Sequence, residues 1–352
     1  RELGPVVHDV APAEFETSKV TGVTNQSRVD ENIRLFRSLF RGREEVYPIR
    51  WENQKGSEGY SPACGNEWHK TLCGKPRVKC GACPNNHFLP VTDQVIHDHL
   101  IGKMTIGVYP ILEDGSCWFL AIDFDKTSWR DDVQAFTDSC LHFNIPAYVE
   151  RSRSGDGAHV WIFFSQSVQA SLAKKLGSMV LTHAMARRPG IGLESYDRLF
   201  PSQDTLPKGG FGNLIALPLQ KQPRELGNSE FLTDTLEPVD DQWAYLDSVR
   251  RLPHNQVERL VQQHDVGDNL LGVRRVSLLE DELEDSWTRE ELQHAPDPYA
   301  ADNMPESVKL VLSNGLRIPK QGLPPSLQNT LIRLAAFQNP EFYRAQAMRM
   351  ST

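Results

Sequence analysis

The chain has 352 residues, of which 39% are hydrophobic, and a formal net charge of −8. That length accommodates about two domains, and the hydrophobic content is ample for a buried core. The longest apolar stretches, such as 118–122 and 160–164, are far shorter than the roughly 20 residues that cross a bilayer, so we expect no contact with a membrane. The acidic balance argues against a protein that coats nucleic acid non-specifically, because neutralising phosphates requires clustered Lys and Arg side chains.

The N-terminal segment shows no sustained hydrophobic periodicity. The chain begins at Arg1 without an initiator methionine or a secretory signal, so we expect it to be cut from a longer, cytoplasmic protein. Residues 1–28 contain prolines among several Ser and Thr residues, which predicts a flexible arm. From Asp30 to Phe40, apolar residues recur at helical spacing and predict the first helix.

Four of the six cysteines lie within one short window, 64–83. They are Cys64, Cys73, Cys80 and Cys83. Clustered thiolates favour a closed, structural zinc site over disulfides, so we predict a zinc knuckle here. His69 and His87 are alternative ligands, and Trp68 with its basic neighbours is predicted to contact a nucleic-acid strand, with a solvated loop as the alternative. Cys117 and Cys140 lie in apolar surroundings and are predicted to be core residues.

Helices and strands alternate over the rest of the chain. We expect helices over 91–100, 131–143, 171–186, 242–250 and 255–264, and strands over 107–112, 117–125, 147–150, 158–164 and 213–219. The first two strands are predicted to form a hairpin around the turn 113–115. His97 and His99 are predicted to be surface residues, because side chains two apart do not share a helix face.

We divide the chain at changes in its pattern. The main domain spans 29–252, a helical and acidic linker spans 253–303, and amphipathic patterning returns in 304–352, where we expect a further domain to begin. No internal repeat is evident.

Asp123 and Asp125 end an apolar strand and are the most informative pair in the sequence. Residues i and i+2 of a strand point to the same face, so the two carboxylates converge. Like charges at that separation require a cation, and hard oxygen ligands suit Mg²⁺ or Mn²⁺. Two solvated acids at a strand end are the alternative interpretation.

A glycine-rich turn follows, with Ser154, Gly155 and Gly157 directly before His159. Backbone amides in such a turn bind phosphate, and His159 would contact a triphosphate with the help of Arg151 and Arg153. A core histidine capped by its own turn is the alternative. Farther along, the segment 194–204 offers two candidate third carboxylates, Asp197 and Asp204, and spacing alone does not choose between them.

The order of these three segments resembles the three motifs of archaeo-eukaryotic primases. The resemblance covers about residues 33–252 and is closest to the primase domain of the TOTE conflict systems. The segments that carry this closer resemblance are 35–43, 196–204 and 210–220. The family's second motif often has serine two residues before the histidine, whereas this chain has Gly157 there.

The resemblance implies an α+β fold with an RRM-like catalytic sheet, an N-terminal αβ unit and the inserted zinc knuckle. It implies a template-dependent DNA primase-polymerase of a bacterial mobile element or conflict system, which adds nucleotides from (d)NTPs to a 3′-hydroxyl with Mg²⁺ or Mn²⁺. Asp123 and Asp125 would bind these ions together with Asp204, which we prefer for its distance from the strand end 217–218, or Asp197. The residues expected at the nucleotide are His159, Ser154, Gly155, Gly157, Arg151, Arg153 and Lys208.

The implied partners are a DNA template and primer, nucleoside triphosphates and a helicase region of the same full-length protein. No phosphate-binding loop motif occurs in the chain, so an ATP-driven motor would lie beyond Thr352. Two other functions fit parts of the pattern: a metal-dependent nuclease, which needs the acids but no triphosphate-binding turn, and a non-catalytic nucleic-acid-binding module.

Overall fold

The structure, a computed structural model, describes residues 22–53, 56–125, 128–187, 196–206 and 209–264. All of them belong to the first of two compact units, which spans 1–287. The predicted arm lies almost wholly outside these residues, as do most of the predicted linker and all of 304–352. In the described part of the chain, no helix has the length and apolar character that a membrane crossing requires.

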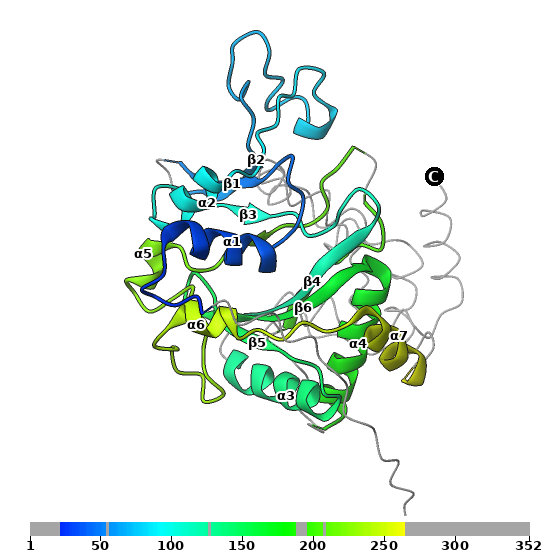
Figure 1. Cartoon of the computed structure of the whole chain (residues 1–352). Helices are drawn as coiled ribbons and strands as arrows, with labels where there is room; N and C mark the ends of the chain where they lie inside the picture. The colour runs from blue at the N-terminus through cyan, green and yellow to red at the C-terminus, as the bar shows by residue number, and fades with distance from the viewer. Residues whose placement is uncertain (1–21, 54–55, 126–127, 188–195, 207–208, 265–352) are drawn as a thin grey trace, which may run out of the picture. The chain divides into compact units, whose positions relative to one another are not determined.

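A four-stranded antiparallel sheet organises the described unit (Figure 1). Its strands, in spatial order, are β5 (Tyr148–Arg151), β6 (Gly157–Gln169), β4 (Ser116–Asp125) and β7 (Tyr196–Phe200). Helix α3 (Trp129–His142) connects β4 to β5, and α4 (Ala170–Ala186) connects β6 to β7. The chain order βαββαβ with this strand order is the ferredoxin-like split βαβ arrangement. The expected mixture of helices and antiparallel strands is therefore confirmed.

The two faces of the sheet are covered by different parts of the chain. On one face, Leu120, Ile122 and Phe124 of β4 pack in a buried cluster with apolar residues of α3 and α4. On the other face, Phe119 and Ala121 belong to a second buried cluster, which includes residues of the N-terminal elements. This alternation follows from the two-residue period of a strand, and it leaves Asp123 and Asp125 on the face away from α3 and α4.

The N-terminal elements form an αβ unit over the second face. They are α1 (Val29–Leu39), β1 (Pro48–Glu52), β2 (Glu58–Pro62), α2 (Asp93–Leu100) and β3 (Gly107–Val108). Strands β1 and β2 form an antiparallel hairpin, and β3 pairs with β8 (Ile215–Ala216). The aromatic ring of Phe40 packs edge-on against Trp161 of β6 with 5.0 Å between ring centroids, which links the unit to the sheet.

Three helices follow β8 within the described residues. They are α5 (Lys221–Arg224), α6 (Gln242–Asp247) and α7 (His254–Gln263). Asp241 caps α6 by accepting hydrogen bonds from the backbone of Trp243 and Ala244. Helix α7 packs against α4 and buries Val257 in the cluster under the sheet, although the sequence pattern placed it in the linker.

The predicted hairpin around 113–115 is wrong. Strand β3 ends at Val108 and pairs with β8, and Pro110, which has no N–H to donate to a ladder, follows closely. The Leu112 amide donates to the Ser116 carbonyl at 2.8 Å and closes a turn, after which β4 pairs with β6 and β7 instead.

The prediction that His99 lies on the surface is also wrong, because its side chain is completely buried. The Ile106 amide donates to Nδ1 at 3.2 Å, so Nε2–H is the donor to the Pro218 carbonyl at 3.0 Å. Burial lowers the pKa of His99 to about 4, so the ring is a neutral link between α2 and the segment after β8. Cys117 and Cys140 are buried, as predicted.

Candidate functional site

Three carboxylates converge at one end of the sheet. Asp123 and Asp125 end β4, and Asp197 lies on the neighbouring strand β7. One ligand atom from each lies within 4.8 Å of the others. Among the residues that the structure describes, no other group of His, Cys, Asp and Glu side chains brings ligand atoms so close together. The predicted convergence of the first two acids is confirmed.

The electrostatics of Asp123 favour the binding of a cation. Its side chain is 15% exposed, and its Oδ1 atom is buried without a hydrogen-bond partner. Burial raises the pKa of Asp123 to about 6; His159 opposes this shift, while Asp125 and Asp197 add to it. A divalent cation would pair with the orphaned oxygen and relieve the repulsion, and three carboxylates are the hard donors that Mg²⁺ or Mn²⁺ prefers.

His159 lies directly opposite Asp123 in the β4–β6 ladder, and its Nε2 atom is 3.6 Å from Asp123 Oδ1. Its other ring nitrogen, Nδ1, is 2.6 Å from Oε2 of Glu150, which lies opposite it on β5. Burial lowers the pKa of His159, but Glu150, Asp123 and Asp125 outweigh this effect and raise it to about 9. The two ring nitrogens of this buried histidine therefore face Asp123 and Glu150.

Glu150 is the residue of this site that the sequence patterns did not identify. It is only 2% exposed, and it also accepts a hydrogen bond from Trp161 Nε1 at 3.2 Å. The row Glu150, His159, Asp123 thus crosses three adjacent strands. Glu150 ends the predicted strand 147–150, and this position could have identified it, because a buried carboxylate requires partners.

The third carboxylate is where our preference and the geometry differ. Asp197 joins the cluster and is hydrogen bonded by Arg198 Nε at 2.7 Å. Asp204 lies outside it, with 56% of its side chain exposed and an ion pair to Lys174 of α4 at 2.5 Å. Because α4 covers the opposite face of the sheet, this pair draws Asp204 away from Asp123. We preferred Asp204 because of its spacing along the chain. Spacing does not show that Asp197 belongs to a strand that pairs with β4.

The family comparison agrees with this geometry. Residues 31–260, more than half of the chain, match the domain family described as "TOTE conflict system, Archaeo-Eukaryotic Primase domain". The chain belongs to this family. It therefore contains a primase-type nucleotidyltransferase domain, and its acid cluster is the place where such a domain would hold divalent metal ions.

Two further comparisons add little to the assignment of this primase domain. No curated protein matches the chain. A solved structure, the "Polymerase Domain from Mycobacterium tuberculosis Ligase D in complex with DNA", is similar at 14% sequence identity and a TM-score of 0.36, over 67% of this chain and 87% of that one.

Glycine is required at 157 by the closeness of two strands of the primase domain. A Cβ atom at that position would lie 2.4 Å from the Phe124 carbonyl oxygen and 2.6 Å from Asp125 Oδ1. The residue is the Cα partner of Asp125 in the ladder. Any side chain here would therefore push on the metal-site carboxylate, which explains why this chain has no serine two residues before His159.

The turn before His159 is held by its own hydrogen bonds. The Ser154 hydroxyl lies 3.1 Å from that of Ser152 and accepts a hydrogen bond from the Asp156 amide. Gly155 has a φ of +85°, and its amide donates to the Ser152 carbonyl at 3.0 Å. Ser154 and the Gly155 amide thus stabilise the turn through hydrogen bonds within it. Gly157 allows β6 to lie close to β4.

The predicted basic residues of this turn point to different neighbours. Arg151 donates from Nη1 to the Gly227 carbonyl at 3.4 Å. Arg153 has a buried Nε atom without a hydrogen-bond partner, and burial together with Arg50 of β1 lowers its pKa. Arg50 is itself ion-paired with Glu52 and Glu58, which balance its positive charge beside the turn. Lys208 lies outside the described residues.

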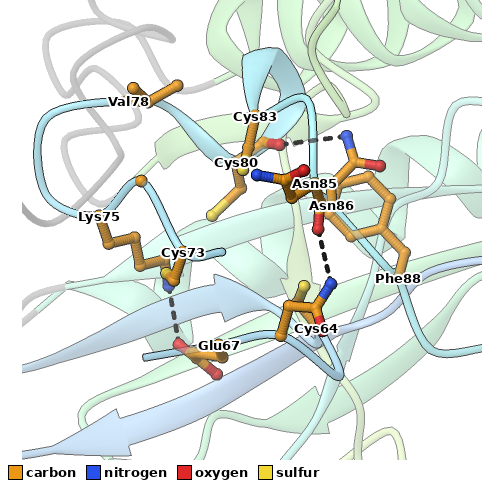
Figure 2. A pocket seen from close by; sticks show the side chains of 12 residues that line it. Cys64, Glu67, Cys73, Lys75, Val78, Cys80, Cys83, Asn85, Asn86 and Phe88 are labelled. Carbon is orange, nitrogen blue, oxygen red and sulfur yellow. Dashed lines mark hydrogen bonds and ion pairs between the residues drawn. The ribbon is translucent and has the colours of Figure 1, made fainter. Parts of the chain in front are cut away.

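The four clustered cysteines line one pocket in the segment between β2 and α2, which we call the cysteine finger (residues 64–88) (Figure 2). Cys80 and Cys83 occupy one 3₁₀ turn, in which the Cys83 amide donates to the Cys80 carbonyl. The His87 amide donates to Cys64 Sγ at 3.3 Å. The four side chains therefore come together from separate parts of the finger, although the thiols are less tightly grouped than the ligand atoms of the acid cluster.

Proposed function

We propose that this chain is a template-dependent DNA primase-polymerase that transfers nucleotides from (d)NTPs to a 3′-hydroxyl. The observation that carries the proposal is the convergence of Asp123, Asp125 and Asp197 in a chain of the archaeo-eukaryotic primase family. Two Mg²⁺ or Mn²⁺ ions bound there would stabilise charge on the attacking and departing oxygens of an in-line displacement.

The protein's own residues would hold and orient the reactants. Asp123 would bind metal through Oδ1, which accepts no hydrogen bond, while Gly157 lets β6 lie close enough to keep Asp125 in place. His159 directs Nε2 toward the acid cluster and would contact the triphosphate of the incoming nucleotide. Arg153, which lies in this turn, would add positive charge for the same phosphates.

For the cysteine finger we propose a structural zinc ion bound by Cys64, Cys73, Cys80 and Cys83. The fit rests on the donor set: four thiols line one pocket, and a backbone amide already donates to one sulfur. Four thiolates leave no open position for a reacting water, so the ion would stabilise structure and not take part in catalysis.

The same finger is proposed to contact the DNA template. Trp68 is 58% exposed, and Lys70, Arg77 and Lys79 of the same finger are exposed. Basic side chains beside an exposed aromatic ring are the combination that binds single strands, through phosphate contacts and base stacking. We further propose that the domain acts in a conflict system, next to a helicase region of a longer chain.

The test is a primer-extension assay with a labelled primer on a DNA template, Mn²⁺ or Mg²⁺, and single nucleotides. The proposal expects addition only of the nucleotide complementary to the template. Shortening of the primer would favour the metal-dependent nuclease, and template binding without any addition would favour the non-catalytic module. Either result would overturn the proposed function.

A further inference from the structure

Glu150 is a buried carboxylate to which the proposed reaction assigns no part. Its side chain is 2% exposed and lies on β5, one strand beyond His159 and two strands beyond Asp123. A buried charge is costly unless it is paired, and Glu150 has two donors from β6. They are His159 Nδ1 at 2.6 Å and Trp161 Nε1 at 3.2 Å.

These contacts fix the histidine ring in one orientation. An ionised carboxylate only accepts hydrogen bonds, so the nitrogen that faces Glu150 must carry a proton. Nε2 is then the ring atom that faces the acid cluster, 3.6 Å from Asp123 Oδ1. Trp161 holds the same Glu150 oxygen from a second direction, which prevents the carboxylate from following a rotation of the imidazole.

We propose that Glu150 is a positioning residue for nucleotide binding: it keeps the proton on His159 Nδ1 and aims Nε2 at the phosphates of the incoming nucleotide. The inference rests on the proposed function of this site. Glu150 itself touches neither metal nor nucleotide, because β6 lies between it and the acid cluster. Its influence is exerted through His159.

The matched test is Glu150→Gln, which preserves the size and acceptor oxygen of the side chain but removes its charge. Hydrogen bonds to charged groups are stronger than those to neutral ones, so we expect KM for the nucleotide to rise about tenfold. We expect kcat to change less than about twofold, because the metal ligands are unaltered. Glu230→Gln is the control, since Glu230 is a partly buried acid paired with Arg224 outside the site.

A double-mutant cycle separates positioning from a general effect on the fold. If Glu150 acts through His159, Glu150→Gln should raise KM no further in a His159→Ala background. An equal rise in both backgrounds, or a parental KM in Glu150→Gln alone, would overturn the inference.

A second measurement does not depend on catalysis. In ¹⁵N NMR spectra of the full chain, we expect a proton on His159 Nδ1 that shows a short hydrogen bond, and a weakened bond in Glu150→Gln. An unprotonated Nδ1 would contradict the role of Glu150. If the parental chain shows this signal but incorporates no nucleotide, the proposed function and the nucleotide-binding part of the inference are refuted. The hydrogen bond between Glu150 and His159 would still stand.

Discussion

The catalytic sheet and the cysteine finger hold their functional side chains in opposite ways. In β4, seven of the ten residues are buried, and the strand is paired on both sides, to β6 and to β7. Across residues 64–88, every residue is at least partly exposed, and short-range turns hold the backbone. The sheet thus presents a preformed site, whereas the finger has almost no core of its own and would depend on a bound ion.

Replacing Asp123 should have the largest effect on the rate of primer extension, because it removes a proposed metal ligand from the catalytic sheet. We expect Asp123→Asn to lower the rate of primer extension about 10,000-fold, because ion-mediated charge stabilisation is worth several kcal/mol. The unfolding temperature should stay equal to or exceed that of the parent, since a buried, repelled charge is removed. A normal extension rate would contradict the metal site; a loss of folded protein would contradict the stability argument.

A matched pair of substitutions distinguishes the third ligand. Asp197→Asn should reduce extension about 1,000-fold, through loss of one ion ligand, whereas Asp204→Asn should stay within about threefold of the parent. The reason is that Asp197 belongs to the cluster and Asp204 pairs with Lys174. If steady-state assays show a larger loss for Asp204→Asn than for Asp197→Asn, Asp204 is the third carboxylate, as its spacing suggested.

Equivalent glycine substitutions compare the two regions directly. In Gly157→Ala, the new Cβ meets Asp125 and the β4 backbone, and a metal ligand displaced by about 1 Å should cost about 100-fold in extension rate. In Gly81→Ala, the Cβ would clash with the Gly209 carbonyl oxygen, so the disturbance falls on the finger and on the segment before β8, not on the acid cluster. We expect the extension rate of Gly81→Ala to fall less than about threefold. Comparable losses in both variants would show that catalysis depends on the finger as much as on the sheet.

The smallest effect on catalysis should come from the cysteines. Cys80→Ser with Cys83→Ser should abolish zinc in elemental analysis and weaken template binding about tenfold, since each stacked base is worth about 1–3 kcal/mol. At saturating template we expect the parental kcat. Cys140→Ala, in the core under the sheet, is the control and should retain zinc. Full zinc content in the double variant would refute the ligand assignment.

Local patterns in the sequence were sufficient for part of the site. The alternation of a single strand places Asp123 and Asp125 on one face, and His159 begins a later apolar strand that pairs beside them. Both features are readable without knowledge of the tertiary fold, because a period of two depends only on the chain itself.

Pairing between distant strands was not readable in the same way. Asp197 belongs to the site because β7 pairs with β4, and Glu150 because β5 pairs with β6. His99 is buried because segments far along the chain supply its partners, and β3 pairs with β8 instead of its neighbour in sequence. Each depends on contacts that no local propensity encodes, which is where tertiary structure overrides pattern.

The most direct test of the central claim is the position of the catalytic ions. A crystal of the chain grown with Mn²⁺ and a non-hydrolysable nucleotide would give anomalous signal at each ion. We predict signal between Asp123, Asp125 and Asp197, with the triphosphate within reach of His159 Nε2. Signal at Asp204, or none at the three acids while nucleotide is bound elsewhere, would contradict the account.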